Sequence, residues 1–135
     1  ADLGIAVVIG EHPHVIQPME WVEGKNGNQT LVIYSLGNFM SAQDGDLNML
    51  GGMASWSIRK NGETGAISIE NVKFYPTVTH FEPVFTKFKS YLLKDYTDEL
   101  ASQHGLNGYA GQTITRQLFI DAVNEIMNDQ FEIIY

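Results

Sequence analysis

The segment Ile5-Ala6-Val7-Val8-Ile9-Gly10 constrains the fold most, because it is a short, continuous apolar run that ends at a glycine. Its β-branched residues are typical of strands, and the run is far too short to span a bilayer. A run without polar alternation indicates a strand whose two faces are both covered. The sequence therefore predicts a fully buried strand over residues 5–9.

Turn signals divide the next part of the chain into further strands. The turn at Lys25-Asn26-Gly27-Asn28 predicts a hairpin, because Asn and Gly tolerate the positive φ of a tight turn. A second hairpin is expected at residues 61–65, Asn-Gly-Glu-Thr-Gly. The polar, glycine-containing segment over residues 41–52 favours a mobile loop. We therefore expect strands near residues 16–23, 30–36, 53–60 and 66–75.

The last two of these strands alternate between apolar and polar residues. Such alternation is typical of an antiparallel sheet with one covered face. The residues expected to face the core are Met53 (weakly), Trp56, Ile58, Ile67, Ile69, Val72 and Phe74.

The last third of the chain favours helices. Thr97 is the expected N-cap of a helix near residues 97–104, with acidic residues in its first turn. A second helix is expected near residues 115–128, and residues 75–96, which contain two prolines, are expected to form a connecting loop. The apolar face of the second helix would consist of Leu118, Phe119, Ala122, Val123, Ile126 and Met127.

Composition narrows the function classes. The net charge of −8 would repel phosphate backbones, which argues against nucleic acid as a partner. An anionic polymer could be held only through a local metal or a small basic patch. Because the chain has no Cys, any metal must be bound by imidazole, carboxylate or amide oxygen. The length of 135 residues suits one domain or part of one.

The loop Gly10-Glu11-His12-Pro13-His14-Val15 is the first candidate site. A His-x-His pair directly after a strand can direct both imidazoles towards one point, and Pro13 stiffens the loop between them. The two histidines are equally compatible with a surface loop or with structural hydrogen bonding. A metal such as zinc normally takes at least three protein ligands, so the pair alone leaves both interpretations open.

Two linked segments, VVIGEHPHVIQPMEW and LVIYSLGNFMSAQ, resemble the CapA-type proteins of bacterial poly-γ-glutamate capsule synthesis. The segment LLKDYTDELASQHG adds a weaker similarity. The family is in turn similar to the calcineurin-like metallophosphoesterases. The resemblance implies an α/β (α+β) fold with a mostly antiparallel or mixed sheet, namely the C-terminal half of a metallophosphatase-like β-sandwich with two C-terminal helices. Residues 1–80 would be the sheet region with the HPH and SLGNF motifs, and residues 81–135 the loop and the helices.

The resemblance also implies a site. His12 and His14 match the histidines that close a two-metal centre, although Glu11 stands where the phosphoesterases have glycine. Asn38 would line the same site, or it could simply be a turn residue that ends a strand. Two-metal hydrolysis needs both ions held by several carboxylate and imidazole ligands. The chain has no counterpart of the other ligands, so a divalent metal (Mn, Zn or Fe) is expected in the full-length domain and this chain alone is expected to be inactive.

Two classes of function follow from this resemblance. The parent would take part in making, exporting or anchoring an anionic capsule polymer at the bacterial cell envelope, and its enzyme activity stays open. Alternatively, the chain is a non-catalytic interaction or assembly module of the capsule machinery. The start at Ala1-Asp2, inside the recognisable pattern, also leaves open that the chain is a fragment, with any export signal outside it. An uncovered sheet face would then predict a homo-oligomer or an exposed apolar patch.

The remaining candidates have simpler structural interpretations. His80 is expected on a sheet face, and His104 at a helix C-terminus, where a positive charge interacts favourably with the helix dipole. Asp44 and Asp46 lack the spacing of a calcium loop and are expected in a solvated loop. Trp21, Trp56 and the tyrosines are too scattered to form a stacking platform.

Overall fold

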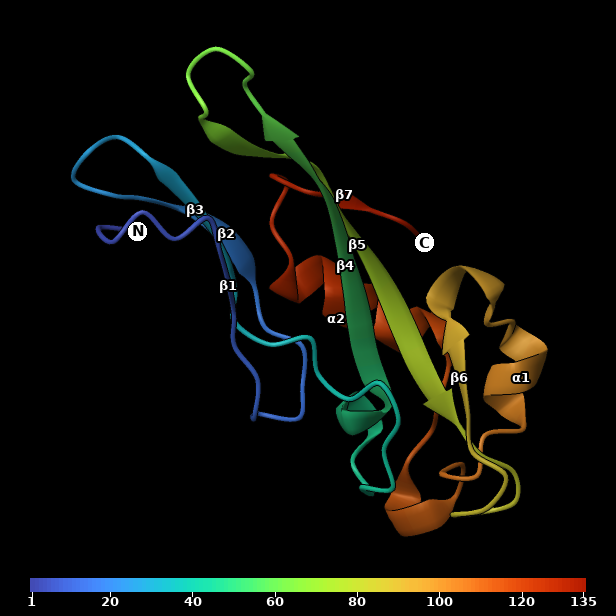
Figure 1. Ribbon diagram of the computed structural model, residues 1–135. Helices are drawn as coiled ribbons and strands as arrows, with labels where there is room; N and C mark the ends of the chain where they lie inside the picture. Colours follow the sequence, from blue (N-terminus) through green and yellow to red (C-terminus); the bar gives the residue numbers. More distant parts are fainter.

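The structure is a computed structural model that describes residues 1–135, and it contains two β-sheets (Figure 1). The first sheet has three strands, β1 (Val7–Ile9), β2 (Met19–Glu23) and β3 (Gln29–Ile33), in the order β1-β3-β2. β1 runs parallel to β3, whereas β2 and β3 form an antiparallel pair. The strands are shorter than predicted: β1 and β2 lie within their expected ranges, and β3 begins one residue before its expected range.

The hairpin between β2 and β3 is confirmed. Gly27 has φ +75, a left-handed conformation that suits glycine, and its amide donates to the carbonyl oxygen of Gly24 at 2.9 Å. The amide of Gly24 in turn donates to the carbonyl oxygen of Asn28 at 2.8 Å. The local turn chemistry therefore fixes the register of these two strands.

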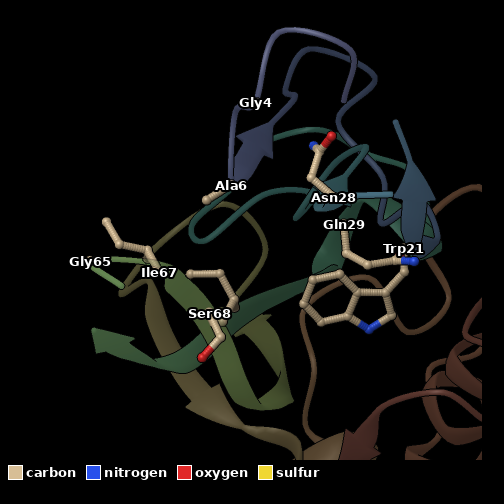
Figure 2. Close-up of a pocket in the computed structure, with 9 residues that line it drawn as sticks. Gly4, Ala6, Trp21, Asn28, Gln29, Gly65, Ile67 and Ser68 are labelled. Atoms are coloured by element: carbon tan, nitrogen blue, oxygen red, sulfur yellow. The ribbon is translucent and has the colours of Figure 1, made fainter. Parts of the chain in front are cut away.

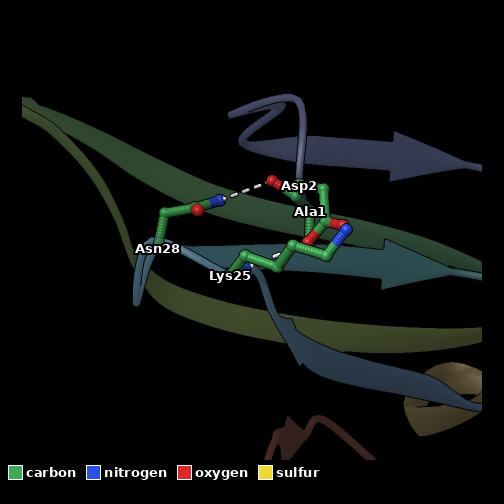
Figure 3. A network of polar contacts seen from close by, with 4 residues as sticks. All are labelled: Ala1, Asp2, Lys25 and Asn28. Carbon is green, nitrogen blue, oxygen red and sulfur yellow. Dashed lines mark hydrogen bonds and ion pairs between the residues drawn. The ribbon is translucent and has the colours of Figure 1, made fainter.

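The first residues of the chain are tied to this hairpin (Figure 3). The Asn28 side-chain amide donates to the Ala1 carbonyl oxygen at 2.8 Å, and Lys25 Nζ lies 2.7 Å from an Asp2 carboxylate oxygen. Thr30 donates its hydroxyl to the Ile5 carbonyl oxygen. These contacts hold the N-terminal segment alongside the first sheet.

The second sheet is built on the long hairpin of β4 (Leu50–Lys60) and β5 (Ile67–His80). The strands β6 (Lys89–Leu92) and β7 (Glu132–Ile133) also pair with β5, antiparallel and parallel respectively. The hairpin turn expected at residues 61–65 is confirmed, with the Asn61 side chain accepting hydrogen bonds from two backbone amides inside the turn.

The loop expected over residues 75–96 is confirmed only for residues 81–88, between β5 and β6, and is wrong for the rest of that range. β5 continues through Pro76 to His80, and β6 returns along it. Proline is tolerated here because β7 pairs with β5 up to Phe74 and β6 pairs from Thr77, so that Pro76 falls between the two ladders. β4 likewise begins three positions before the expected strand, and the segment before it forms a short 3-10 helix, η1 (Asp46–Met49).

The helices begin where the sequence indicates. Helix α1 (Asp98–Ser102) is capped by Thr97, whose hydroxyl accepts from the Leu100 amide at 3.1 Å. Helix α2 (Arg116–Ile126) is capped in the same way by Thr115, and it packs its apolar face on the second sheet (Figure 1). Two further 3-10 helices, η2 (Leu93–Asp95) and η3 (Tyr109–Gly111), lie in the same third of the chain.

One apolar core joins the first sheet, the base of the long hairpin and the helices. Phe74 is fully buried, and Trp56, Ile69 and Val72 pack against the core, as expected. The expectation that Ile58 and Ile67 face the core is wrong. Their exposed fractions are 68% and 61%, because the tip of the β4–β5 hairpin extends beyond α2 (Figure 1). Met53, the weakest of these candidates, is also exposed.

The prediction that residues 5–9 are fully buried is wrong as well. Val8 and Ile9 are 39% and 51% exposed, and β1 is an edge strand of the first sheet. The fold is a mixed α+β architecture with two sheets, in agreement with the expected class. No helix is both long and apolar enough to cross a membrane.

Candidate functional site

The His-Pro-His loop lies beside the segment that follows β3. Parallel strands place their carboxyl ends at the same edge of a sheet, and β1 and β3 are such a pair. The amide of Gly10 donates to the Ile33 carbonyl oxygen at 2.7 Å, and a bridge joins Ile16 to Leu36. These contacts bring His14 and Asn38 together, although they are 24 positions apart.

Asn38 contacts His14 twice. Its Oδ1 lies 2.9 Å from His14 Nδ1, and its Nδ2 donates to the His14 carbonyl oxygen at 3.1 Å. Nδ2 also has the Gln43 side-chain oxygen at 2.9 Å and the Asn48 carbonyl oxygen at 3.2 Å. Because acceptors surround Nδ2, the orientation of the Asn38 amide is fixed, and Oδ1 faces the imidazole.

This contact determines which nitrogen of His14 carries the proton. An amide oxygen can only accept, so His14 Nδ1 must be the donor. In the neutral ring, Nε2 then keeps its lone pair. A metal-binding histidine commonly has this arrangement, in which the nitrogen that does not bind the metal donates to an oriented oxygen. Asn38 is therefore suited to position His14 rather than to bind a metal itself.

His12 and His14 also share an unusual backbone. Their φ values are 115 and 61, and positive φ is uncommon for residues other than glycine. Such conformations are costly and concentrate at functional sites, where surrounding contacts maintain them. The two rings have centroids 6.1 Å apart and are tilted by 45°. Both side chains are exposed, so the imidazoles are accessible to a ligand.

His12 and His14 are not joined by further metal-ligating side chains. Nowhere do three or more His, Asp or Glu side chains gather as a metal site. Two imidazoles fit as part of a ligand set, but they do not complete one. Asp44 and Asp46 do not join them: Asp46 accepts from the next backbone amide at the start of η1, and the Asp44 carbonyl oxygen accepts from Gln112.

Two residues at this site were missed by the sequence analysis. Asn48 donates from Nδ2 to the His14 carbonyl oxygen at 3.0 Å, and Gln43 accepts from Asn38. The Asn48 contact joins the loops after β1 and β3, and the Gln43 contact holds Asn38 within its own loop. No local pattern marks Asn48, because its contact depends on how two distant loops meet, whereas Gln43 contacts Asn38 within one loop.

A separate cleft of about 800 Å³ lies between the first sheet and the tip of the long hairpin (Figure 2). Trp21 and Gln29 line it from the first sheet, and Ile67 and Ile69 line it from β5. The histidine loop does not contribute to it. The cleft is therefore distinct from the His12–His14 site.

His80 and His104 lie elsewhere, at the end of β5 and in the turn after α1. His80 is a buried sheet residue, as expected, and its Nδ1 lies 3.0 Å from the Tyr96 hydroxyl oxygen. The interpretation of His104 as a charged group at a helix end is wrong. It is buried, and burial lowers the pKa of both histidines below the ordinary value while it raises the pKa of Tyr96.

The segment that contains the histidine loop and Asn38 matches a known family of capsule proteins. Residues 1–43 match the family described as bacterial capsule synthesis protein PGA_cap. More particularly, the chain is 31% identical over 75 residues to the PGA biosynthesis protein CapA of Bacillus subtilis (strain 168). The resemblance to CapA-type capsule biosynthesis proteins that the motifs indicate is thus confirmed.

The match covers 56% of this chain and 18% of the Bacillus protein, so the chain spans less than a fifth of the length of that relative. No solved structure matches the chain significantly.

Proposed function

We propose that this chain is the C-terminal portion of a CapA-like capsule biosynthesis protein whose complete domain has a metallophosphatase-like fold. The family match over residues 1–43, which contains the histidine loop and Asn38, supports this assignment. The parallel β1–β3 pair is consistent with it, because parallel strands normally lie in sheets with both faces covered. The parent would act on or assemble poly-γ-glutamate at the bacterial cell envelope.

Within that protein, His12 and His14 would each supply one ligand to a divalent cation such as Mn²⁺, Zn²⁺ or Fe²⁺. The hydrogen bond from His14 Nδ1 to Asn38 carries this proposal, since it leaves Nε2 of an exposed ring free to bind a metal. The bound cation would act as a Lewis acid in hydrolysis or transfer. The residues of this chain hold and orient that cation, and the remaining ligands would come from another part of the protein.

A metal is also the simplest way for this chain to contact an anionic polymer. Its net charge is −8, and three of its eight cationic side chains are already in ion pairs, with Asp2, Glu70 and Glu132. An acidic surface repels a polyanion at a distance. A cation at the histidine loop would reverse that repulsion locally.

Calorimetric titration of the chain with Zn²⁺ and Mn²⁺ tests the proposal. We expect measurable binding by the wild type and loss of binding in a His12→Ala/His14→Ala double variant. A His80→Gln variant is the matched control, because His80 is a buried histidine that contacts Tyr96 and makes no hydrogen bond with the loop. Equal heats in the wild type and the double variant would contradict the ligand assignment.

The second candidate is a non-catalytic interaction module. It is favoured by the exposed apolar side chains of β1, an edge strand that a further strand could join. Analytical ultracentrifugation across a concentration series tests whether the chain self-associates. A Val8→Lys variant should reduce association if this edge is the interface, whereas a monomer at all concentrations would contradict the module as a homo-oligomer.

A further inference from the structure

His80 and His104 form a buried imidazole pair that the proposed metal site does not use. Their side chains come from the end of β5 and from the turn after α1, and their ring centroids are 5.3 Å apart in an edge-to-face arrangement. The exposed fractions of the two residues are 4% and 2%. A buried histidine must stay neutral unless a counter-charge accompanies it, so the surroundings of this pair decide how it responds to acid.

His104 is held in one neutral tautomer by two backbone groups. The Leu106 amide donates to His104 Nδ1 at 3.0 Å, so Nδ1 carries no proton. Nε2 therefore carries the proton, and it donates to the Thr79 carbonyl oxygen at 3.0 Å. A second proton can be added only at Nδ1, and it would eliminate the bond from Leu106.

Apart from the Thr79 carbonyl oxygen, the surroundings of His104 offer no compensation for a positive charge. The ring packs on the Phe81 ring, with centroids 4.8 Å apart, and on His80. The titratable group that acts on His104 is His80, and a charge on His80 would disfavour a positive charge on His104. The groups that face His80 are Glu82 and Lys89, of opposite sign, together with the rings of Tyr91 and Tyr96.

These contacts attach one segment to the second sheet. The Gly105 amide donates to the Phe81 carbonyl oxygen at 2.7 Å, and a Cβ at Gly105 would lie 2.6 Å from the Phe81 ring. His104 and Gly105 thus connect residues 97–114, which contain α1 and η3, to the end of β5. Loss of this connection would expose Phe81 and Leu106, both fully buried in the closed structure.

We propose that this connection is acid-sensitive: protonation of His104 at Nδ1 breaks its bond with the Leu106 amide and releases residues 97–114 from the end of β5. The open segment would bind more protons than the closed one, since burial holds the pKa of His104 below its ordinary value. The closed state is therefore fully favoured above the ordinary histidine pKa, and it loses stability as the pH falls from there towards the lowered pKa. Acidification would therefore favour the open state, in which residues 97–114 are released from the end of β5.

Nuclear magnetic resonance of the ¹⁵N-labelled wild type is the first test. The ring nitrogen shifts should show His104 as the Nε2–H tautomer at neutral pH, titrating below the ordinary histidine value. Amide exchange, corrected for its intrinsic pH dependence, should show protection over residues 97–114 falling about tenfold between pH 7.5 and 5.5, a change of the size that one pK unit of linkage produces. Protection in the β4–β5 hairpin should change less than twofold.

A His104→Gln variant provides the second test, because its side-chain amide keeps a donor for the Thr79 carbonyl oxygen and cannot titrate. We expect its exchange over residues 97–114 to lose the pH dependence. His104 titrating at or above the ordinary value, a uniform loss of protection across the chain, or an unchanged pH dependence in this variant would each overturn the proposal. The wild-type titration decides the question even if the variant does not fold.

Discussion

Replacement of Asn38 by alanine tests how the candidate site is organised. The substitution removes the acceptor 2.9 Å from His14 Nδ1 and the donor to the His14 carbonyl oxygen. A hydrogen bond in a protein contributes about 1 kcal/mol net, and water can partly replace the bond to this exposed ring. We therefore expect Asn38→Ala to weaken metal binding through His14 by about fivefold to tenfold, at the lower end of what oriented outer-shell contacts contribute.

Two measurements check this expectation. Calorimetry with Zn²⁺ gives the change in affinity, and ring ¹⁵N shifts of the metal-free chain give the tautomer of His14. In the wild type, His14 should be the Nδ1–H tautomer, and in Asn38→Ala the mixture should shift towards Nε2–H. The tautomer measurement needs no metal, so it tests the role of Asn38 even if the chain requires further ligands to bind metal tightly.

Gln43→Ala is the matched control, because Gln43 accepts from Asn38 but does not contact the His14 ring. It should change the affinity less than twofold by this reasoning, since the Oδ1–Nδ1 contact survives. Wild-type His14 predominantly in the Nε2–H form, or equal losses of affinity in the Asn38 and Gln43 variants, would refute the positioning role.

Two stability predictions follow from the backbone. Thr115→Ala removes the cap of α2 and should lower the free energy of unfolding by about 1 kcal/mol in urea denaturation. Thr113 is exposed, so the control Thr113→Ala should change the free energy of unfolding by less than about 0.5 kcal/mol. Equal effects of the two variants would argue against the cap. Gly52→Ala places a Cβ 2.2 Å from the Phe74 ring and should lower the free energy of unfolding by about 1–3 kcal/mol. In the control Gly62→Ala, the new Cβ meets no atom within 4 Å, so the stability should be nearly unchanged. Thermal melts of both variants compare them directly.

Much of the local structure could be predicted because short-range chemistry determines it. Thr97 and Thr115 cap helices through bonds to amides three residues ahead, and the Asn-Gly turns close their hairpins within a few residues. These features need no distant partner. The prediction failed over residues 75–80, where Pro76 indicates a loop but pairing with β4 and β6 keeps β5 intact.

The candidate site was only partly accessible from the sequence. His12 and His14 are marked by their spacing, and a resemblance drew attention to Asn38. The tautomer of His14 follows only from the three-dimensional contact with Asn38. The contribution of Asn48 depends in the same way on the meeting of two loops.

By itself, the sequence determined many local features of this protein: most of the extended segments apart from the end of β5, β6 and β7, where the hairpin turns close, where the helices begin, and that any metal must be bound by nitrogen or oxygen ligands. Only the tertiary structure decided which side chains are buried and which polar atoms pair. The apolar strand β1 lies exposed at an edge, whereas the polar His104 is enclosed and neutral. The physical reason is that burial and hydrogen bonding between distant segments depend on what packs against a residue, and neighbours along the chain do not specify that.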